Sequence, residues 1–222
     1  MLLYYITDRT QLGANDDEQR AALLIRIAEA ARAGVDYIQL REKDLPTHSL
    51  ELLGREALDA VRKNSSHTKL LINARPDVAL AVGADGVHLP AQDLQASEVR
   101  SLWMKSSDRS PIVGVSAHSS ADVRYAEAHG ANFAVLAPIY EKADGTRMPI
   151  GLAELRESCS PLASSPNTEV RHSARFSVLA LGGVTLANAV ECLDAGAAGI
   201  AGIRLFQSGD MYSTVEALRG MR

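Results

Sequence analysis

The sequence predicts a single (βα)8 TIM barrel over residues 1–222, and an internal repeat is the main reason. A helix end, a glycine and an apolar strand recur as ARAGVDYIQL (31–40), AVGADGVHL (81–89), EAHGANFAVL (127–136) and LDAGAAGIAGI (193–203). The first two intervals between the repeated glycines are 49 and 47 residues. Because one strand–helix unit takes about 25 residues, each repeat covers two units and four repeats give eight strands.

The remaining elements fall between these repeats in chain order. We expect the other strands at Leu2–Thr7, Leu70–Asn73, Ile112–Ser116 and Ser177–Gly183. Amphipathic patterns predict helices over Asp17–Ala33, His48–Arg62, Ala96–Met104, Ala121–His129, Leu152–Ser158, Leu186–Asp194 and Met211–Gly220. One more helix begins at Pro76, where a first turn tolerates proline, and ends at Gly83. Apolar strands alternating with such helices are typical of a parallel sheet. An open doubly wound sheet is the alternative, but no GxGxxG follows the first strand.

Composition narrows the class of protein. The chain is 46% hydrophobic and 23% charged, an ordinary globular balance, and its net charge is −4. No long basic run favours nucleic acid, and no apolar run reaches the roughly 18 residues of a membrane span. The start, MLLYYITDRTQ, does not resemble a secretory signal, so we expect a cytoplasmic protein. Cys159 and Cys192 have no metal-ligand spacing and are expected to be reduced thiols.

The last repeat is stretched by an insertion, CSPLASSPNTEVRHSARF, at residues 159–176. It is rich in serine, proline and charge, which predicts a flexible loop. It joins a helix to a strand, so it belongs to the N-terminal face of the barrel, opposite the face that carries active sites.

Polar residues where strands end are the candidates for chemistry. Gln39, Arg41 and Lys43 alternate at the end of the second strand, so two cations and an amide could point into the barrel mouth. The alternative is a salt-bridged strand edge that uses Glu42 and Asp44. Polar groups also end the third and fourth strands, with Asn73 on one and Gln92 and Asp93 just past the other.

Gly182 and Gly183 end the seventh strand, and Arg204 follows the eighth. In barrels the loops after these two strands often bind phosphate together, and paired glycines let a phosphate approach backbone N–H groups. We therefore expect a phosphate site here, with Arg204 adding a charge. The alternative is an ordinary glycine turn.

Ser116 and His118 share a side at the end of the fifth strand. His118 is a candidate acid or base, since an imidazole titrates near neutrality. The alternative makes His118 a packing residue beside a helix cap at Ser119. His88, inside the fourth strand, is expected to be a satisfied interior histidine. The long loop after the sixth strand resembles a lid over 140–150, from which Lys142 or Arg147 could reach an anionic substrate.

Several motifs together resemble the thiamine phosphate synthase/TenI family. They are YITDR at 5–9, DYIQLREKD at 36–44, LIN with DVALAVGADGVHL at 71–89, GVSAHS at 114–119, API at 137–139 and ALGGVT with NAVECLDAGAAGI at 180–200. The resemblance covers nearly the whole chain and implies a (βα)8 barrel. It also implies an enzyme that joins hydroxymethylpyrimidine diphosphate to thiazole phosphate, with magnesium, and releases pyrophosphate.

The resemblance assigns roles to the residues that match its motifs. Gln39, Arg41, Lys43 and Asn73 resemble the residues that hold the pyrimidine and its diphosphate, and Ser116 would contact the leaving pyrophosphate. Gly182, Gly183, Ile203 and Arg204 fall at the thiazole phosphate site, where a serine is commoner than Arg204. Asp93 resembles one of two magnesium carboxylates, and Ala74 stands where the family usually has the other.

The sister branch of the family implies an alternative. It isomerises a thiazole carboxylate phosphate without a metal, with a histidine matching His118 as suspected acid/base, and His88-Leu89-Pro90 resembles that branch. A non-catalytic thiazole-phosphate-binding protein is the second alternative. All three predict small phosphorylated partners rather than nucleic acid or membrane, and a homodimer is compatible with each.

Overall fold

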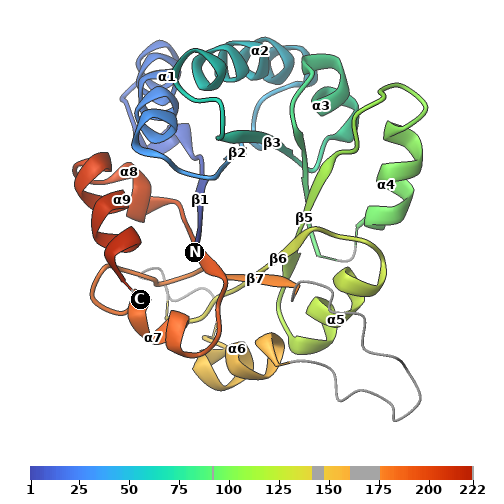
Figure 1. Ribbon diagram of the computed structural model, residues 1–222. Coiled ribbons are helices and arrows are strands. Elements are labelled where there is room, and N and C mark those ends of the chain that lie inside the picture. The colour runs from blue at the N-terminus through green and yellow to red at the C-terminus, as the bar shows by residue number, and fades with distance from the viewer. Residues whose placement is uncertain (92, 142–147, 161–175, 222) are drawn as a thin grey trace.

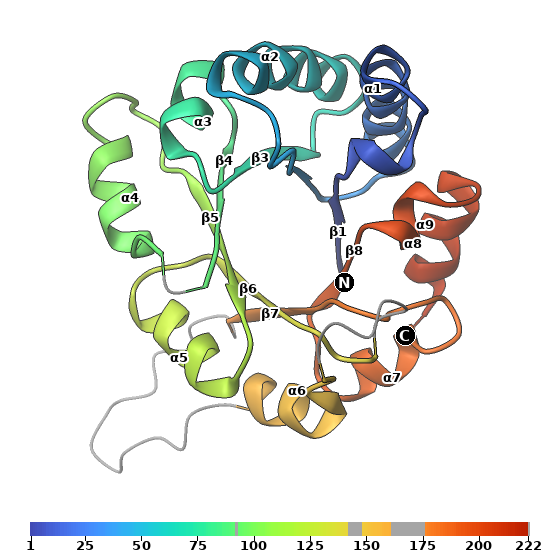
Figure 2. The same cartoon turned by 180° about the vertical axis from the view of Figure 1, so that it is seen from behind.

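The computed structural model describes residues 1–91, 93–141, 148–160 and 176–221. Eight parallel strands form a closed barrel in the order β1-β2-β3-β4-β5-β6-β7-β8, and the helices surround it (Figures 1 and 2). The predicted (βα)8 barrel is therefore confirmed. None of the described helices is both long and apolar enough to cross a bilayer.

The strands are β1 (Leu2–Ile6), β2 (Tyr37–Leu40), β3 (Lys69–Asn73), β4 (Gly86–Leu89), β5 (Ile112–Ala117), β6 (Phe133–Leu136), β7 (Ser177–Ala180) and β8 (Gly199–Gly202). The helices are α1 (Asp16–Ala33), α2 (Thr47–Asn64), α3 (Pro76–Val82), α4 (Ala96–Trp103), α5 (Ser120–Ala128), α6 (Gly151–Cys159), α7 (Ala189–Asp194), α8 (Arg204–Gln207) and α9 (Met211–Gly220). A 3₁₀ turn, η1 (Arg9–Gln11), follows β1.

The predicted bounds differ from these mainly near the seventh strand. β7 ends at Ala180 rather than Gly183, because Gly182 and Gly183 have φ values of +94° and +67° that leave the extended conformation. The next helix begins at Ala189 rather than Leu186, since Asn188 first closes a turn by accepting a hydrogen bond from the Thr185 N–H. The sequence pattern did not predict η1 or α8.

The repeat has a physical explanation in two parts. Its four glycines, Gly34, Gly83, Gly130 and Gly196, all have positive φ, between +74° and +100°, which a helix end of this kind requires. The polar residue two positions after each of the first three glycines then accepts a hydrogen bond from the backbone of a neighbouring strand. The bonds are Leu3 N–H to Asp36 (2.7 Å), Leu70 N–H to Asp85 (2.9 Å) and Val113 N–H to Asn132 (2.8 Å).

Two apolar clusters stabilise the barrel. The larger lies between the strands and the surrounding helices, and the smaller includes Tyr4, Leu71, Phe133 and Leu179. In the smaller cluster the ring centroids of Tyr4 and Phe133 lie 5.3 Å apart in an edge-to-face arrangement. Tyr37 stacks on Phe133 with the ring centroids 5.1 Å apart. These rings fill the barrel below the ends of the strands.

Candidate active site

A cavity of about 840 Å³ opens where the carboxyl ends of the strands meet. Residues near the carboxyl ends of the strands line it, among them Arg41 after β2, Asn73 at the end of β3, and Ser116 in β5. This is the face at which (βα)8 barrels carry their ligand sites.

The structure brings Gln39, Arg41 and Lys43 to the wall of this cavity. Gln39 is buried, Arg41 is half-buried and Lys43 is exposed, so the row runs from the floor to the mouth. Within the described part of the chain, no acidic side chain forms an ion pair with Arg41. A partly desolvated guanidinium of this kind is suited to binding an anion such as a phosphate.

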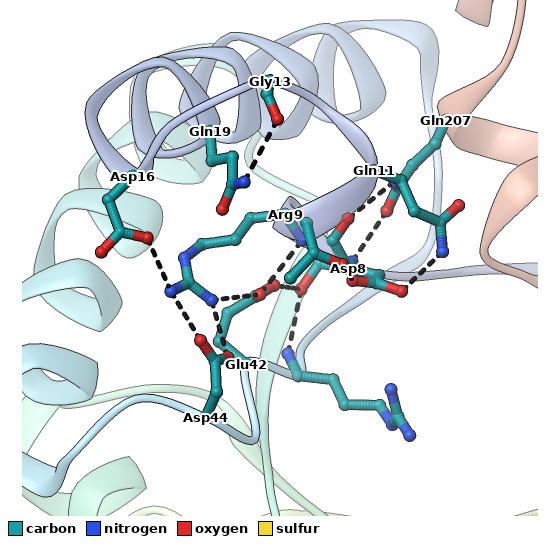
Figure 3. Close-up of polar contacts among 12 residues, drawn as sticks. Asp8, Arg9, Gln11, Gly13, Asp16, Gln19, Glu42, Asp44 and Gln207 are labelled. Carbon is teal, nitrogen blue, oxygen red and sulfur yellow. Dashed lines mark hydrogen bonds and ion pairs between the residues drawn. The ribbon is translucent and has the colours of Figure 1, made fainter.

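The neighbouring acids pair with a different cation, Arg9, the first residue of η1 (Figure 3). Arg9 is only 4% exposed and donates two hydrogen bonds to Asp44, at 2.7 and 2.8 Å. Its backbone N–H and one side-chain nitrogen reach Glu42, at 3.1 and 3.5 Å. The Arg9 hydrogen bonds lower the pKa of Asp44 and raise that of Arg9. The predicted salt-bridged edge thus exists, but it uses Arg9.

This network also fixes the start of the cationic segment. Thr7 donates a hydrogen bond of 2.5 Å to Glu42 and accepts one of 2.9 Å from the Arg41 backbone N–H. Arg9 is therefore connected, through Glu42 and Thr7, to the segment that carries Arg41 and Lys43. The YITDR motif contains Arg9, but the sequence alone assigns it no role. The one signal for it is a cation two residues after the expected strand end at Thr7.

A buried hydrogen-bond chain crosses the floor of the cavity. Gln39 Nε2 donates to the Tyr4 hydroxyl (2.8 Å), the hydroxyl contacts His88 Nδ1 (3.2 Å), and His88 Nε2 contacts Ser116 Oγ (2.9 Å). Burial lowers the pKa of His88 to about 3, with the nearby Arg41 as a second cause, so the imidazole is neutral. His88 is the interior histidine that the sequence predicted, and both of its ring nitrogens have partners.

His118 lies at the exposed rim of the same cavity. Its Nδ1 lies 2.8 Å from the Ala137 carbonyl oxygen, and because a carbonyl oxygen can only accept, Nδ1 donates a hydrogen to it. The Ser119 side chain caps α5 by accepting from the Asp122 N–H. The helix cap of the alternative interpretation is therefore present, and the Ala137 carbonyl fixes the orientation of His118 at the cavity rim.

The paired glycines have a packing role that does not depend on phosphate. A Cβ at Gly182 would lie 2.7 Å from the Pro138 Cα, and one at Gly183 would lie 2.6 Å from the Tyr140 Cβ. Neither glycine is among the residues that line the main cavity, whereas the adjacent Leu181 is. Ile203 after β8 lines the cavity, but Arg204 is exposed at the start of α8 and does not. A phosphate site of these residues would lie beside the cavity wall.

The described side chains do not fit a magnesium ion held by the protein alone. No three His, Cys, Asp or Glu residues within the described ranges form a metal-binding group. Asp93 lines a second cavity of about 740 Å³ and accepts from its neighbour's backbone, the Leu94 N–H, at 2.8 Å. Ala74 lines the main cavity and offers no oxygen ligand from its side chain. It has a left-handed φ of +56°, which is strained for alanine.

Two predictions concern residues outside the described ranges. Lys142 and Arg147 fall in 142–147, and most of the predicted flexible loop falls in 161–175. Lys142 as a catalytic residue and the mobility of the insertion therefore remain predictions.

Comparison with known proteins identifies the family. A family model described as "Thiamine monophosphate synthase" matches residues 3–206. The chain belongs to the thiamine monophosphate synthase family. Its relatives include an Aquifex aeolicus protein, provisionally named thiamine-phosphate synthase 2, which is 39% identical over 92% of this chain and 96% of its own.

Further members of the thiamine monophosphate synthase family are similar over almost their full length. The thiamine-phosphate synthase of Methanoculleus marisnigri is 34% identical over 98% of this chain and 93% of its own. The solved structure of a thiamine phosphate pyrophosphorylase from Pyrococcus furiosus is 28% identical, with a TM-score of 0.76, over 99% of this chain and 94% of its own. A resemblance to 3-hexulose-6-phosphate synthase, at 18% identity, shows the barrel fold alone.

Proposed function

We propose that this protein is a thiamine phosphate synthase that joins hydroxymethylpyrimidine diphosphate to thiazole phosphate and releases pyrophosphate. The observation that carries the proposal is the row of Gln39, Arg41 and Lys43 along one cavity wall, in a chain of this family. The cavity of about 840 Å³ has room for two small phosphorylated molecules.

Five of the cavity residues are assigned roles in this reaction. Gln39 and Asn73 hold the pyrimidine, and Arg41 and Lys43 bind its diphosphate. The bond between the pyrimidine methylene carbon and the diphosphate oxygen breaks, and its electron pair leaves with pyrophosphate. Arg41, Lys43 and Ser116 stabilise that leaving charge, which lowers the barrier to forming the carbocation. The thiazole nitrogen then supplies the electron pair of the new C–N bond.

The thiazole phosphate is assigned to the loops after β7 and β8. Gly182 and Gly183 would offer backbone N–H groups there, Ile203 would contact the thiazole, and Arg204 would pair with the phosphate. The exposed position of Arg204, at the start of α8, is compatible with a phosphate near the mouth. Magnesium has no assigned role among these residues, because Asp93 is the single carboxylate that the resemblance retains and it lines the second cavity.

Thiazole isomerisation remains a second candidate function because of His118. Its Nδ1 donates to the Ala137 carbonyl, which orients the imidazole at the rim of the cavity, where a tautomerase would need an acid or base. None of the relatives described above carries a tautomerase name, and each is named as a synthase or pyrophosphorylase.

The decisive experiment incubates the purified protein with both substrates, with and without magnesium, and follows products by mass. Thiamine phosphate in the wild-type reaction is the expected result, and Arg41→Ala should reduce its rate strongly. Arg55→Ala is the matched control, because Arg55 pairs with Glu51 on the exposed face of α2. No thiamine phosphate under either condition overturns the synthase proposal. A separate incubation with the thiazole carboxylate phosphate, followed by NMR because isomers have equal mass, tests the alternative. Isomerisation there would identify a tautomerase, and binding without turnover a non-catalytic protein.

A further inference from the structure

We propose that the buried chain Gln39–Tyr4–His88–Ser116 fixes the direction of the Ser116 hydroxyl, so that Ser116 donates its hydrogen to an anionic oxygen in the main cavity. Tyr4 and His88 are positioning residues in this account, and they act on the ligand through Ser116. The inference rests on the proposed function in one respect, since the anion is taken to be the diphosphate.

Counting the hydrogens along this hydrogen-bond chain shows which group donates and which accepts at each step. The Gln39 amide nitrogen donates to Tyr4, so the hydroxyl hydrogen of Tyr4 must go to its other partner, His88 Nδ1. Burial raises the pKa of Tyr4 above its ordinary value, so the phenol keeps that hydrogen. With Nδ1 accepting, the single hydrogen of the neutral imidazole lies on Nε2.

The last hydrogen bond of the series, between His88 and Ser116, determines which atom of the Ser116 hydroxyl is presented to the cavity. His88 Nε2 then donates to Ser116 Oγ over 2.9 Å. Ser116 has one hydrogen of its own, and because its oxygen already accepts from His88, that hydrogen is left for another acceptor. Ser116 lines the main cavity, where an anionic oxygen can be that acceptor.

The opposite direction would present the wrong group to an anion. It would place the Gln39 carbonyl oxygen against Tyr4 and use the Ser116 hydrogen on His88 Nε2. Ser116 would then turn only lone pairs to the cavity, where Arg41 and Lys43 attract negative charge. The direction of donation that suits an anion in the cavity is therefore the same as the one that the orientation of the Gln39 amide gives.

Packing shields the residues of the hydrogen-bond chain from solvent. Gln39, Tyr4 and His88 are 1%, 0% and 3% exposed, and the Phe133 and Tyr37 rings enclose Tyr4. Tyr4 is not among the residues that line the cavity, so its hydroxyl can influence a ligand only through the groups that do.

The first test reads the His88 tautomer directly, in ¹⁵N-labelled protein by long-range proton–nitrogen NMR, with and without inorganic pyrophosphate. The expected result is hydrogen on Nε2 in both states. Hydrogen on Nδ1 overturns the inference, whether or not the protein makes thiamine phosphate. This arm therefore separates failure of the hydrogen-bond chain from failure of the proposed synthase.

The second test is a double-mutant cycle of pyrophosphate binding by calorimetry. Ser116→Ala removes one hydrogen bond to a charged ligand, so we expect about tenfold weaker binding. Tyr4→Phe should weaken binding by a similar factor, and the double variant by no more than Ser116→Ala alone.

Tyr5→Phe is the matched control for this cycle. Tyr5 is the next residue of β1 and is equally buried, but its hydroxyl bonds Gln207 on the other side of the strand. Pyrophosphate binding by Tyr5→Phe should equal that of the wild type. Wild-type affinity in Tyr4→Phe, or losses that add in the double variant, would overturn the inference. Melting temperatures of all variants identify any loss of folded protein.

Discussion

Replacing Arg9 by glutamine should destabilise the protein far more than replacing an exposed arginine of the same region. Arg9 is 4% exposed and the side chain of Glu42 is 1% exposed, so the substitution leaves a buried carboxylate without its cation. Removing one partner of a buried pair costs about 3–5 kcal/mol. Glu42 keeps its hydrogen bonds from Thr7 and from the backbone N–H of residue 9, so we expect a loss of stability at the lower end of this range, about 3 kcal/mol.

The Asp44 contacts add less to this loss. They are short, but the Asp44 side chain is 58% exposed, and exposed pairs contribute about 0–1 kcal/mol. The expected total is therefore about 3–4 kcal/mol, a large part of the roughly 5–15 kcal/mol that holds an ordinary domain folded. The control is Arg20→Gln, whose 2.8 Å pair with Glu56 is exposed on both sides and should cost less than about 1 kcal/mol.

Urea denaturation at pH 7 measures both free energies of unfolding. Equal losses in the two variants would refute the buried-pair account. The pH dependence gives a second comparison. Arg9 holds the pKa of Asp44 below its ordinary value, so this contribution is complete above about pH 4 and is lost as the pH falls further. The Arg9→Gln variant should lack that acid-dependent loss.

Three further predictions concern the barrel interior and the cavity. Because His88 is held neutral with a pKa of about 3, its imidazole takes up a proton on unfolding below about pH 6.5, and the free energy of unfolding decreases as the pH is lowered. In urea denaturation, lowering the pH from 7 to 5 should reduce the free energy of unfolding of the wild type by about 2 kcal/mol more than that of His88→Gln. Gly86→Ala should fail to give soluble protein, since its Cβ would lie 1.9 Å from the Ile112 carbonyl oxygen, whereas Gly220→Ala, with open space, should keep the wild-type yield and melting temperature. Ala74→Gly should raise the free energy of unfolding by up to about 1 kcal/mol by relieving a φ of +56°, and an unchanged or lower value would contradict the strain.

The repeat made the barrel predictable from the sequence. Each recurring glycine ends a helix in the left-handed conformation, and that requirement is local, so it is visible in the pattern of residues. The end of β7 was misplaced because Gly182 and Gly183 leave the strand to pack against Pro138 and Tyr140, a contact between distant segments. The start of α7 was misplaced because the Asn188 side chain first closes a turn with the Thr185 N–H. Short α8 carries too few residues to show a helical period.

The candidate site was predictable where strand alternation alone decides direction. Gln39, Arg41 and Lys43 follow it to the cavity wall. Arg9 and Tyr4 were missed because their partners, Glu42 and His88, lie 33 and 84 residues away along the chain. Nothing in the local pattern distinguishes a buried arginine from an exposed one. The placement of Asp93 on the second cavity likewise depends on how α4 and α5 pack.

The pairing of β1 with β8 has a consequence for synthesis of the protein. Leu2 pairs with Gly199, so during synthesis one edge of β1 stays uncovered until β8 has been made. Until then it presents unpaired N–H and C=O groups on an apolar strand, the feature through which chains aggregate. Slow elongation before residue 199 should therefore lower the soluble yield of this protein, and chaperones that shield strand edges should restore it.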